Sequence, residues 1–228
     1  MTQRITTFIL ALLLTVTTQA QTSHSETAAS TTFTSSPITP DVEVRITGKS
    51  YPAECSQLLP ISELRYLRIS HWNAEGKSVV GEMICNRAIA KSLLAIFRTL
   101  YEAHYPIERM ELVDEYGADD ERSMQANNTS CFNFRFINGT RTISLHGRGM
   151  AVDINPLYNP CVHRSGKIEP STGAPYAYNR LSIPKSSPAY SYIITGSDHI
   201  VCRIFRAHGF TWGGSWRNKK DYQHFEHK

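Results

Sequence analysis

The sequence lacks several features that mark common classes of protein. It has no dense run of lysine and arginine, because its 24 basic and 20 acidic residues are spread along the chain and leave a net charge of +4. A phosphate backbone is usually bound by a concentrated basic patch, so nucleic acid is not expected as a partner. Beyond the first 20 residues no apolar stretch approaches the roughly 20 residues that a membrane span needs. The chain also contains no internal repeat.

Cysteine is scarce and widely spaced. The five cysteines are Cys55, Cys85, Cys131, Cys161 and Cys202, and none of them forms a C-x-x-C pair. Their spacing does not resemble a zinc finger. One or two disulfides would fit an oxidising compartment, with at least one thiol left over, and the spacing selects no pairing. We expect Cys131 to be a buried apolar residue rather than a nucleophile.

The amino terminus has the pattern of a secretory signal peptide. Arg4 precedes an apolar run over residues 8–16, and small or polar residues lead to Ala20. This predicts a signal peptide over residues 1–20, cleaved after Ala20, and a secreted or periplasmic protein with no membrane span once the signal is removed. Residues 21–42 are rich in Ser and Thr and predict a flexible linker.

The rest of the chain, residues 43–228, predicts one folded domain, because 41% hydrophobic residues suffice for a core. Its elements alternate between strand-like and helix-like patterns. We expect a hairpin of residues 64–72 and 78–84, a helix over 86–104 with Asn86 as N-cap, and a second helix over 198–208. Further strands are expected at 107–113, 132–136, 142–145 and 222–226, with a polar loop at 117–128 and a surface excursion at 156–190. This predicts an α+β domain with a central antiparallel sheet flanked by helices.

Residues that can bind a metal occur in two short runs, SLHGRGMAVD at 144–153 and DYQHFE at 221–226. His146 and Asp153 are seven residues apart, which would place them on opposite faces of one strand. Glycines at 147 and 149 make a continuous helix improbable. We therefore expect a strand that turns at the glycines and continues at 151–154, so that both side chains reach one point.

The second run supplies another imidazole and a spare carboxylate. Asp221 and His224 are three residues apart, which suits a tight turn before the last strand. Three nitrogen or oxygen ligands would leave one position of Zn²⁺ open for water, and a free carboxylate can act as its base. Other divalent ions are compatible with such a site. Glu226 is a second candidate base, and His227 an alternative ligand.

These runs also resemble a known family. The pattern Ser-x-His-x-x-Gly-x-Ala-x-Asp at residues 144–153 resembles the signature of the zinc D-alanyl-D-alanine carboxypeptidases. Residues 127–135 and the tail at 209–226 resemble its endolysin-like branch, which includes L-alanyl-D-glutamate endopeptidases. The resemblance implies the fold shared by these peptidases and hedgehog signalling domains.

The resemblance also implies roles for individual residues. His146, Asp153 and His224 would be zinc ligands, and Asp221 the general base. Much of the wider family has Glu at the position of the base, whereas the endolysin-like branch has Asp. Two further residues, Arg135 and Ser144, would contact the substrate, with Arg135 also stabilising the oxyanion that develops during catalysis.

The expected activity is zinc-dependent hydrolysis of peptidoglycan stem peptides, most simply removal of a terminal D-alanine. An L-alanyl-D-glutamate endopeptidase would use the same metal chemistry. Two alternatives of other classes are a non-catalytic, zinc-containing module that binds the cell wall, and a structural secreted protein without metal.

Overall fold

The computed structural model describes residues 31–228, so the expected signal peptide and the first part of the expected linker lie outside it. The described helices are α1 (Pro40–Ile46), α2 (Ala53–Leu58), α3 (Arg87–Glu102), α4 (Asp120–Gln125) and α5 (Ile200–Ala207), with short 3₁₀ helices at Ile61–Glu63, Val113–Tyr116, Ser171–Tyr176, Arg180–Ser182 and Gly213–Ser215. The strands are β1 (Phe33–Pro37), β2 (Leu64–Trp72), β3 (Ser78–Asn86), β4 (Ala151–Asp153), β5 (Cys161–His163), β6 (Ile168–Glu169), β7 (Thr211–Trp212), β8 (Lys219–Asp221) and β9 (His224–Glu226).

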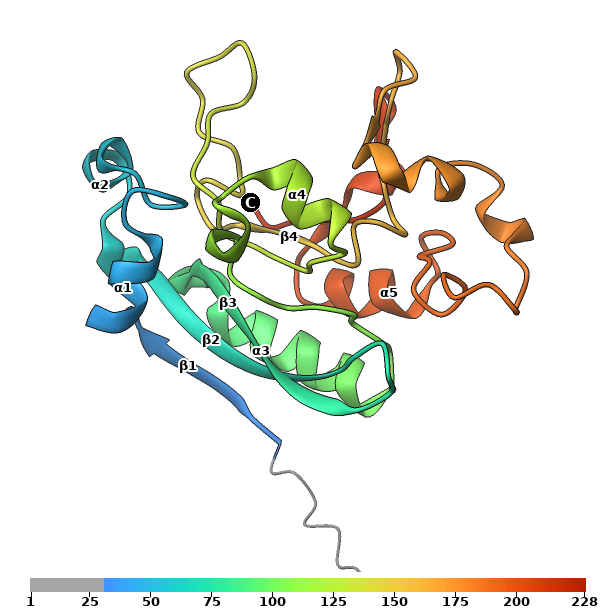
Figure 1. The fold of residues 1–228 in the computed structure, drawn as a ribbon, viewed down its shortest axis with the longest axis horizontal. Helices are drawn as coiled ribbons and strands as arrows, with labels where there is room; N and C mark the ends of the chain where they lie inside the picture. Colours follow the sequence, from blue (N-terminus) through green and yellow to red (C-terminus); the bar gives the residue numbers. More distant parts are fainter. Residues whose placement is uncertain (1–30) are drawn as a thin grey trace, which may run out of the picture.

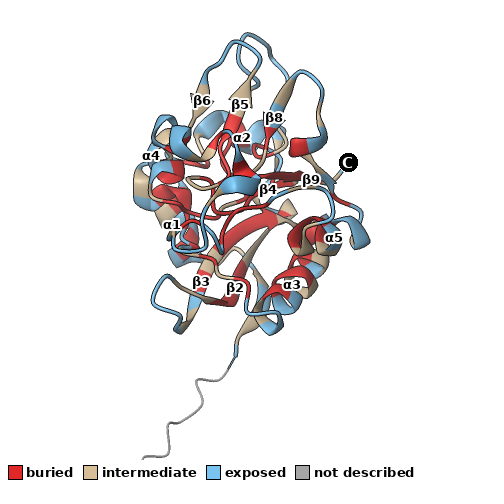
Figure 2. Cartoon of the chain, turned by 90° about the vertical axis from the view of Figure 1, so that its right-hand side faces the viewer, coloured by how far each residue is buried: buried red, intermediate tan, exposed pale blue. Residues whose placement is uncertain are grey.

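The longest elements form a sheet with one helix packed on it. β1, β2 and β3 make an antiparallel sheet, and α3 lies along one face of it (Figure 1). The predicted hairpin and the predicted helix are both confirmed. The Asn86 side chain accepts a hydrogen bond of 3.0 Å from the amide of Ala88, as expected of an N-cap. The buried face of α3, with Leu93, Ile96 and Leu100, joins β2 and β3 in the main core (Figure 2).

The folded region begins earlier than the sequence predicts. β1 pairs with β2 from Phe33↔Ile69 to Pro37↔Arg65, and Val42 in α1 is buried. The prediction of a flexible linker is therefore wrong from Phe33 onward. Ser and Thr dominate this segment, but its backbone groups extend the edge of the sheet, which requires little apolar side-chain burial.

The carboxy-terminal half of the chain contains two smaller sheets. β4, β9 and β7 form one three-stranded antiparallel sheet, and β6, β5 and β8 form another. The α+β class is confirmed, whereas the expected single central sheet is replaced by three small sheets. α5 links the first of these sheets to the core, because Phe205 stacks on Phe225 with ring centroids 4.2 Å apart.

Several local predictions differ from the structure. Residues 107–113 and 132–136 contain isolated bridges but no strand, Val113 begins a 3₁₀ helix, and the expected polar loop at 117–128 contains α4. The second helix begins after His199 rather than Asp198. All five cysteines lie within the described residues and are buried and free, so none of them forms a disulfide. No helix of residues 31–228 is long and apolar enough to cross a membrane.

Gly149 connects the main sheet to the carboxy-terminal half. Its carbonyl accepts a 2.8 Å hydrogen bond from the amide of Asn86, and its φ is +66°. A Cβ built at this position would lie 2.6 Å from that amide nitrogen. Glycine is therefore required here both for backbone conformation and for the close approach of two chain segments.

We expect Gly149→Ala to reduce the free energy of unfolding by more than 2 kcal/mol, because it adds a steric overlap to the cost of a positive φ. Gly139→Ala is the matched control: its φ is +74°, and an added Cβ meets nothing within 4 Å. That variant should lose only about 1–2 kcal/mol. Urea denaturation of both variants measures the difference, and equal losses would show that the contact with β3 is unimportant.

Candidate metal centre

The register between β4 and β9 brings two sequence-distant residues together. Asp153 pairs with His224 and Ala151 pairs with Glu226. Side chains of directly paired residues lie on the same face of a sheet, so the Asp153 carboxylate lies beside the His224 ring. The distance from Asp153 Oδ1 to His224 Nδ1 is 3.1 Å.

His146 reaches the same point from the turn that precedes β4. Backbone hydrogen bonds from Arg148 to Ser144 and from Gly149 to His146 close this turn, as the two glycines predict. His146 Nε2 lies 3.1 Å from His224 Nδ1 and 3.3 Å from Asp153 Oδ2. All three residues are buried, with exposed fractions of 6% for His146, 6% for Asp153 and 8% for His224.

The outer nitrogen of each imidazole already has a partner. His146 Nδ1 donates to the backbone carbonyl of Cys131 at 2.7 Å, and His224 Nε2 faces Glu226 Oε2 at 3.3 Å. These contacts favour a proton on each outer nitrogen, which leaves a lone pair on His146 Nε2 and on His224 Nδ1. Two lone pairs and a carboxylate therefore point at one another in a buried site.

Such an arrangement requires a positive charge at its centre. Burial opposes protonation of His224, but its contacts with Asp153 and Glu226 outweigh this and raise its pKa to about 10. Burial alone would raise the pKa of Asp153, but the two histidines hold it well below its usual value. The hydrogen bond from His224 and the nearby Lys228 lower the pKa of Glu226 to about 2. A proton or a metal cation can fill this position, and the two compete for it.

The distances fit a metal. Nitrogen and oxygen ligands about 2.0–2.1 Å from a tetrahedral zinc lie about 3.3 Å from one another, and the three distances between the donor atoms here are 3.1, 3.1 and 3.3 Å. The set of two imidazoles and one carboxylate is also typical of a catalytic zinc site. His146, Asp153 and His224 thus form a group that can hold a metal ion, as their spacing predicts.

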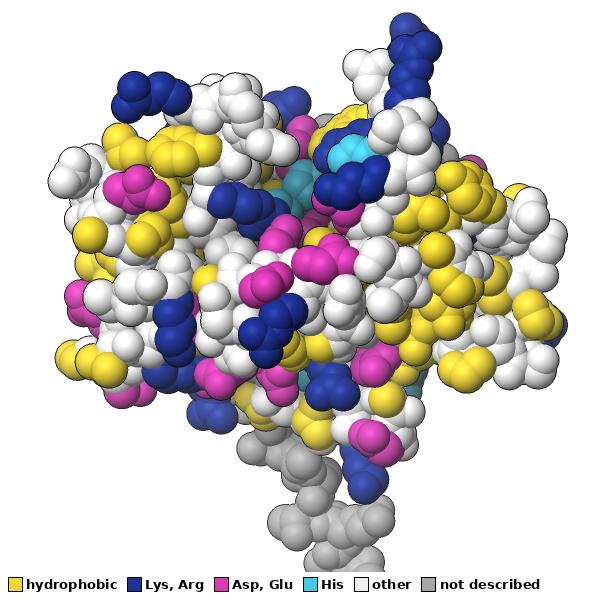
Figure 3. All heavy atoms as spheres, turned by 45° about the horizontal axis from the view of Figure 1, so that its top comes forward, with side chains coloured by type: hydrophobic (Ala, Val, Ile, Leu, Met, Phe, Trp, Pro, Cys, Tyr) yellow, Lys and Arg dark blue, Asp and Glu magenta, His cyan; other side chains and the backbone are white. Residues whose placement is uncertain are grey.

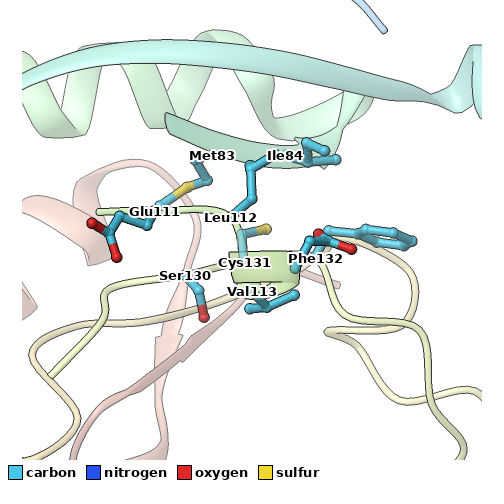
Figure 4. A pocket seen from close by; sticks show the side chains of 9 residues that line it. Met83, Ile84, Glu111, Leu112, Val113, Ser130, Cys131 and Phe132 are labelled. Atoms are coloured by element: carbon cyan, nitrogen blue, oxygen red, sulfur yellow. The ribbon is translucent and has the colours of Figure 1, made fainter. Parts of the chain in front are cut away.

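The metal-binding group lies in the wall of a large cleft. The cleft has a volume of about 600 Å³, within the range of ligand sites. Viewed from above, histidine side chains lie in a hollow bordered by basic and acidic side chains (Figure 3). A separate cavity beneath β3, lined by Met83, Leu112 and Cys131, has a volume of about 10 Å³ (Figure 4). It has room for about one water molecule and no substrate.

Asp221 lines the cleft at the end of β8, in a different sheet from His224. Its Oδ2 accepts from Lys219 Nζ at 2.9 Å, while its Oδ1 is buried and has no hydrogen-bond partner among the described residues. Gly213 makes this placement possible. A Cβ at Gly213 would lie 2.8 Å from the Cβ of Asp221 and 3.2 Å from the Cβ of His224.

Arg135 also lines the cleft and is half-buried. One guanidinium nitrogen, Nη2, pairs with Asp120 Oδ2 at 3.0 Å, and Nη1 is buried without a partner among the described residues. Ser144 also lines the cleft, and its hydroxyl accepts from the amide of Gly147 at 2.9 Å. Ser144 thus stabilises the turn that carries His146.

The two alternatives from the sequence lie elsewhere. Glu226 contacts the outer nitrogen of His224, so it orients that ring and does not face the three donor atoms. His227 packs against Phe210 with ring centroids 5.1 Å apart and is not part of the metal-binding group. Lys219 also lines the cleft, beside Asp221, and the sequence analysis does not identify it. It has no metal-ligand side chain, so no motif indicates it.

Comparison with known proteins finds a matching family model. No curated protein and no solved structure matches the chain significantly. A family model described as D-alanyl-D-alanine carboxypeptidase matches residues 138–227, a range that contains His146, Asp153, Asp221 and His224. Residues 138–227 are therefore similar to the D-alanyl-D-alanine carboxypeptidase family, as the motifs in this range predict.

Proposed function

We propose that the protein is a zinc-dependent peptidase that hydrolyses peptidoglycan stem peptides, most simply as a D-alanyl-D-alanine carboxypeptidase. The observation that carries this proposal is the convergence of His146 Nε2, Asp153 and His224 Nδ1 in a cleft that also contains Asp221 Oδ1, a carboxylate oxygen with no partner in residues 31–228. The match of residues 138–227 to the carboxypeptidase family supports the choice of substrate. Peptidoglycan lies outside the cytoplasm, so we also propose that the amino-terminal signal directs export.

A zinc ion held by these three residues would supply Lewis acidity, polarising the scissile carbonyl and lowering the pKa of water to about 7. Residues of the protein itself transfer the protons. Asp221 Oδ1 takes the proton of the attacking water and later returns it to the leaving amine. The ion pair with Lys219 holds the other oxygen of Asp221 in place.

Arg135, which lines the same cleft, has the complementary role. Its pairing with Asp120 leaves Nη1 without a partner among the described residues, available to a substrate oxygen. A guanidinium held in this way stabilises negative charge on the carbonyl oxygen as the amide is attacked. Glu226 keeps the His224 ring in the orientation that directs Nδ1 inward.

The proposed activity is tested by digesting purified sacculi and synthetic stem peptides and weighing the products. Release of single D-alanine residues is the expected result. Cleavage between L-alanine and D-glutamate would instead assign the endopeptidase activity to the same centre. No cleavage of either bond by zinc-loaded protein would contradict the proposal.

Removal of one ligand should remove the metal. We expect Asp153→Asn to contain about one equivalent of zinc less than wild type and to lose hydrolysis, because the amide carries no negative charge to balance the cation. Elemental analysis after dialysis measures zinc per chain. Asp198→Asn, the same change at an exposed site outside the cleft, is the control and should keep both zinc and activity.

Removal of the base should spare the metal. We expect Asp221→Asn to keep the zinc content of wild type while its rate of hydrolysis falls about 10²–10⁴-fold, since an amide cannot accept the proton. Steady-state kinetics on the cleaved stem peptide measures the loss. A rate within tenfold of wild type would assign the proton transfer to another group.

A further inference from the structure

A second group of metal-ligand side chains occupies the β6-β5-β8 sheet. The group consists of Cys161, His163 and Glu169, whose donor atoms all lie within 4.8 Å of one another. Cys161 is buried, and the other two are half-buried. All three line the same cleft as the first group but share no residue with it.

The register of the sheet explains why these side chains meet. Cys161 pairs with Glu169 on β6, and His163 follows Cys161 by two residues on β5, so all three point to one face. On the other side, Cys161 pairs with Asp221 and His163 pairs with Lys219 on β8. This face therefore presents a thiol, an imidazole and a carboxylate to the cleft, next to Asp221.

Two side chains of this group converge on one imidazole nitrogen. His163 Nε2 faces both the thiol of Cys161, at 3.6 Å, and the carboxylate of Glu169. If the nitrogen carries a proton, it donates to Glu169 and cannot accept from the thiol. If it carries none, its lone pair faces a carboxylate. A single cation between the three atoms satisfies all of them.

The chemistry of the donors indicates the metal. A tetrahedral zinc with a thiolate at about 2.3 Å and an imidazole at about 2.0–2.1 Å sets sulfur and nitrogen about 3.6 Å apart, which is the separation of Cys161 Sγ and His163 Nε2. A thiolate, an imidazole and a carboxylate together favour Zn²⁺ over Mg²⁺ or Ca²⁺. Burial, followed by the charge of Asp221, raises the pKa of the Cys161 thiol, so zinc would displace the thiol proton to solvent on binding.

The two lysines near this group do not block a metal ion there. Lys167 pairs with Glu169 from an exposed position, with 66% of its side chain accessible, and can move into solvent. Lys219 is already paired with Asp221. We propose that Cys161, His163 and Glu169 bind a second zinc ion, with its fourth position open to the cleft, and that this ion fixes the sheet that carries Asp221.

The two sites are distinguished by sulfur, because only the second contains a cysteine. In reduced protein loaded with Co²⁺, a sulfur-to-cobalt charge-transfer band in the near ultraviolet should appear in wild type and His146→Ala and be absent in Cys161→Ala. Cys202→Ala is the matched control and should retain the band, since Cys202 is a buried cysteine in α5, outside the cleft. Elemental analysis should give about two zinc ions per chain in wild type and about one in either Cys161→Ala or His146→Ala.

A milder variant provides a second test in case Cys161→Ala misfolds. Glu169→Gln keeps the size of the side chain and should weaken the second zinc equivalent at least tenfold in competition with a chelator. One zinc per chain in wild type, or a charge-transfer band that survives Cys161→Ala, would overturn the second site. Loss of zinc only in the Cys161 and Glu169 variants, with none lost in His146→Ala, would instead overturn the first centre and leave the second standing.

Discussion

The metal-binding group depends on the antiparallel register between β4 and β9. In β9 the side chains alternate: Phe225 enters the core and stacks on Phe205, so its neighbours His224 and Glu226 must face the cleft. Phe225 is completely buried, and a one-residue slip would bury His224 in its place and turn Phe225 outward. Apolar packing on one face of a three-residue strand thus fixes the direction of a metal ligand on the other.

The same sheet also explains why Glu226, a carboxylate near the motif, does not face the three donor atoms. Spacing in the sequence correctly places Glu226 on the face of His224, and on that ground Glu226 is a candidate base. Its role depends on the orientation of the imidazole, which spacing does not reveal. Because Glu226 occupies Nε2, the ring presents Nδ1 to Asp153 and His146.

The features that the sequence predicts correctly are those whose signals lie within a few neighbouring residues. Asn86 as N-cap, the periodicity of α3, and the turn at Gly149 are encoded within a few residues, and the structure confirms them. Residues 107–113 have the composition of a strand but make only single backbone hydrogen bonds to β2 and β3, from Ile107 to Trp72 and from Glu82 to Met110. Buried asparagines bind other backbone groups of the segment; Asn128, for example, bonds both the amide and the carbonyl of Glu111. Such distant partners leave no pattern in the segment itself.

The position of Asp221 relative to His224 is set by two sheets rather than by one strand. The two residues are three apart in sequence, yet Asp221 ends β8 in one sheet and His224 begins β9 in another. Gly213 lies against both of them, so the two sheets meet there without an intervening side chain. A shift of β8 would therefore move the Asp221 carboxylate relative to His224, which is held by the other sheet. Contacts across the β6-β5-β8 sheet, including those of Cys161 and Lys219, bear directly on the geometry of the centre although neither residue belongs to its ligand set.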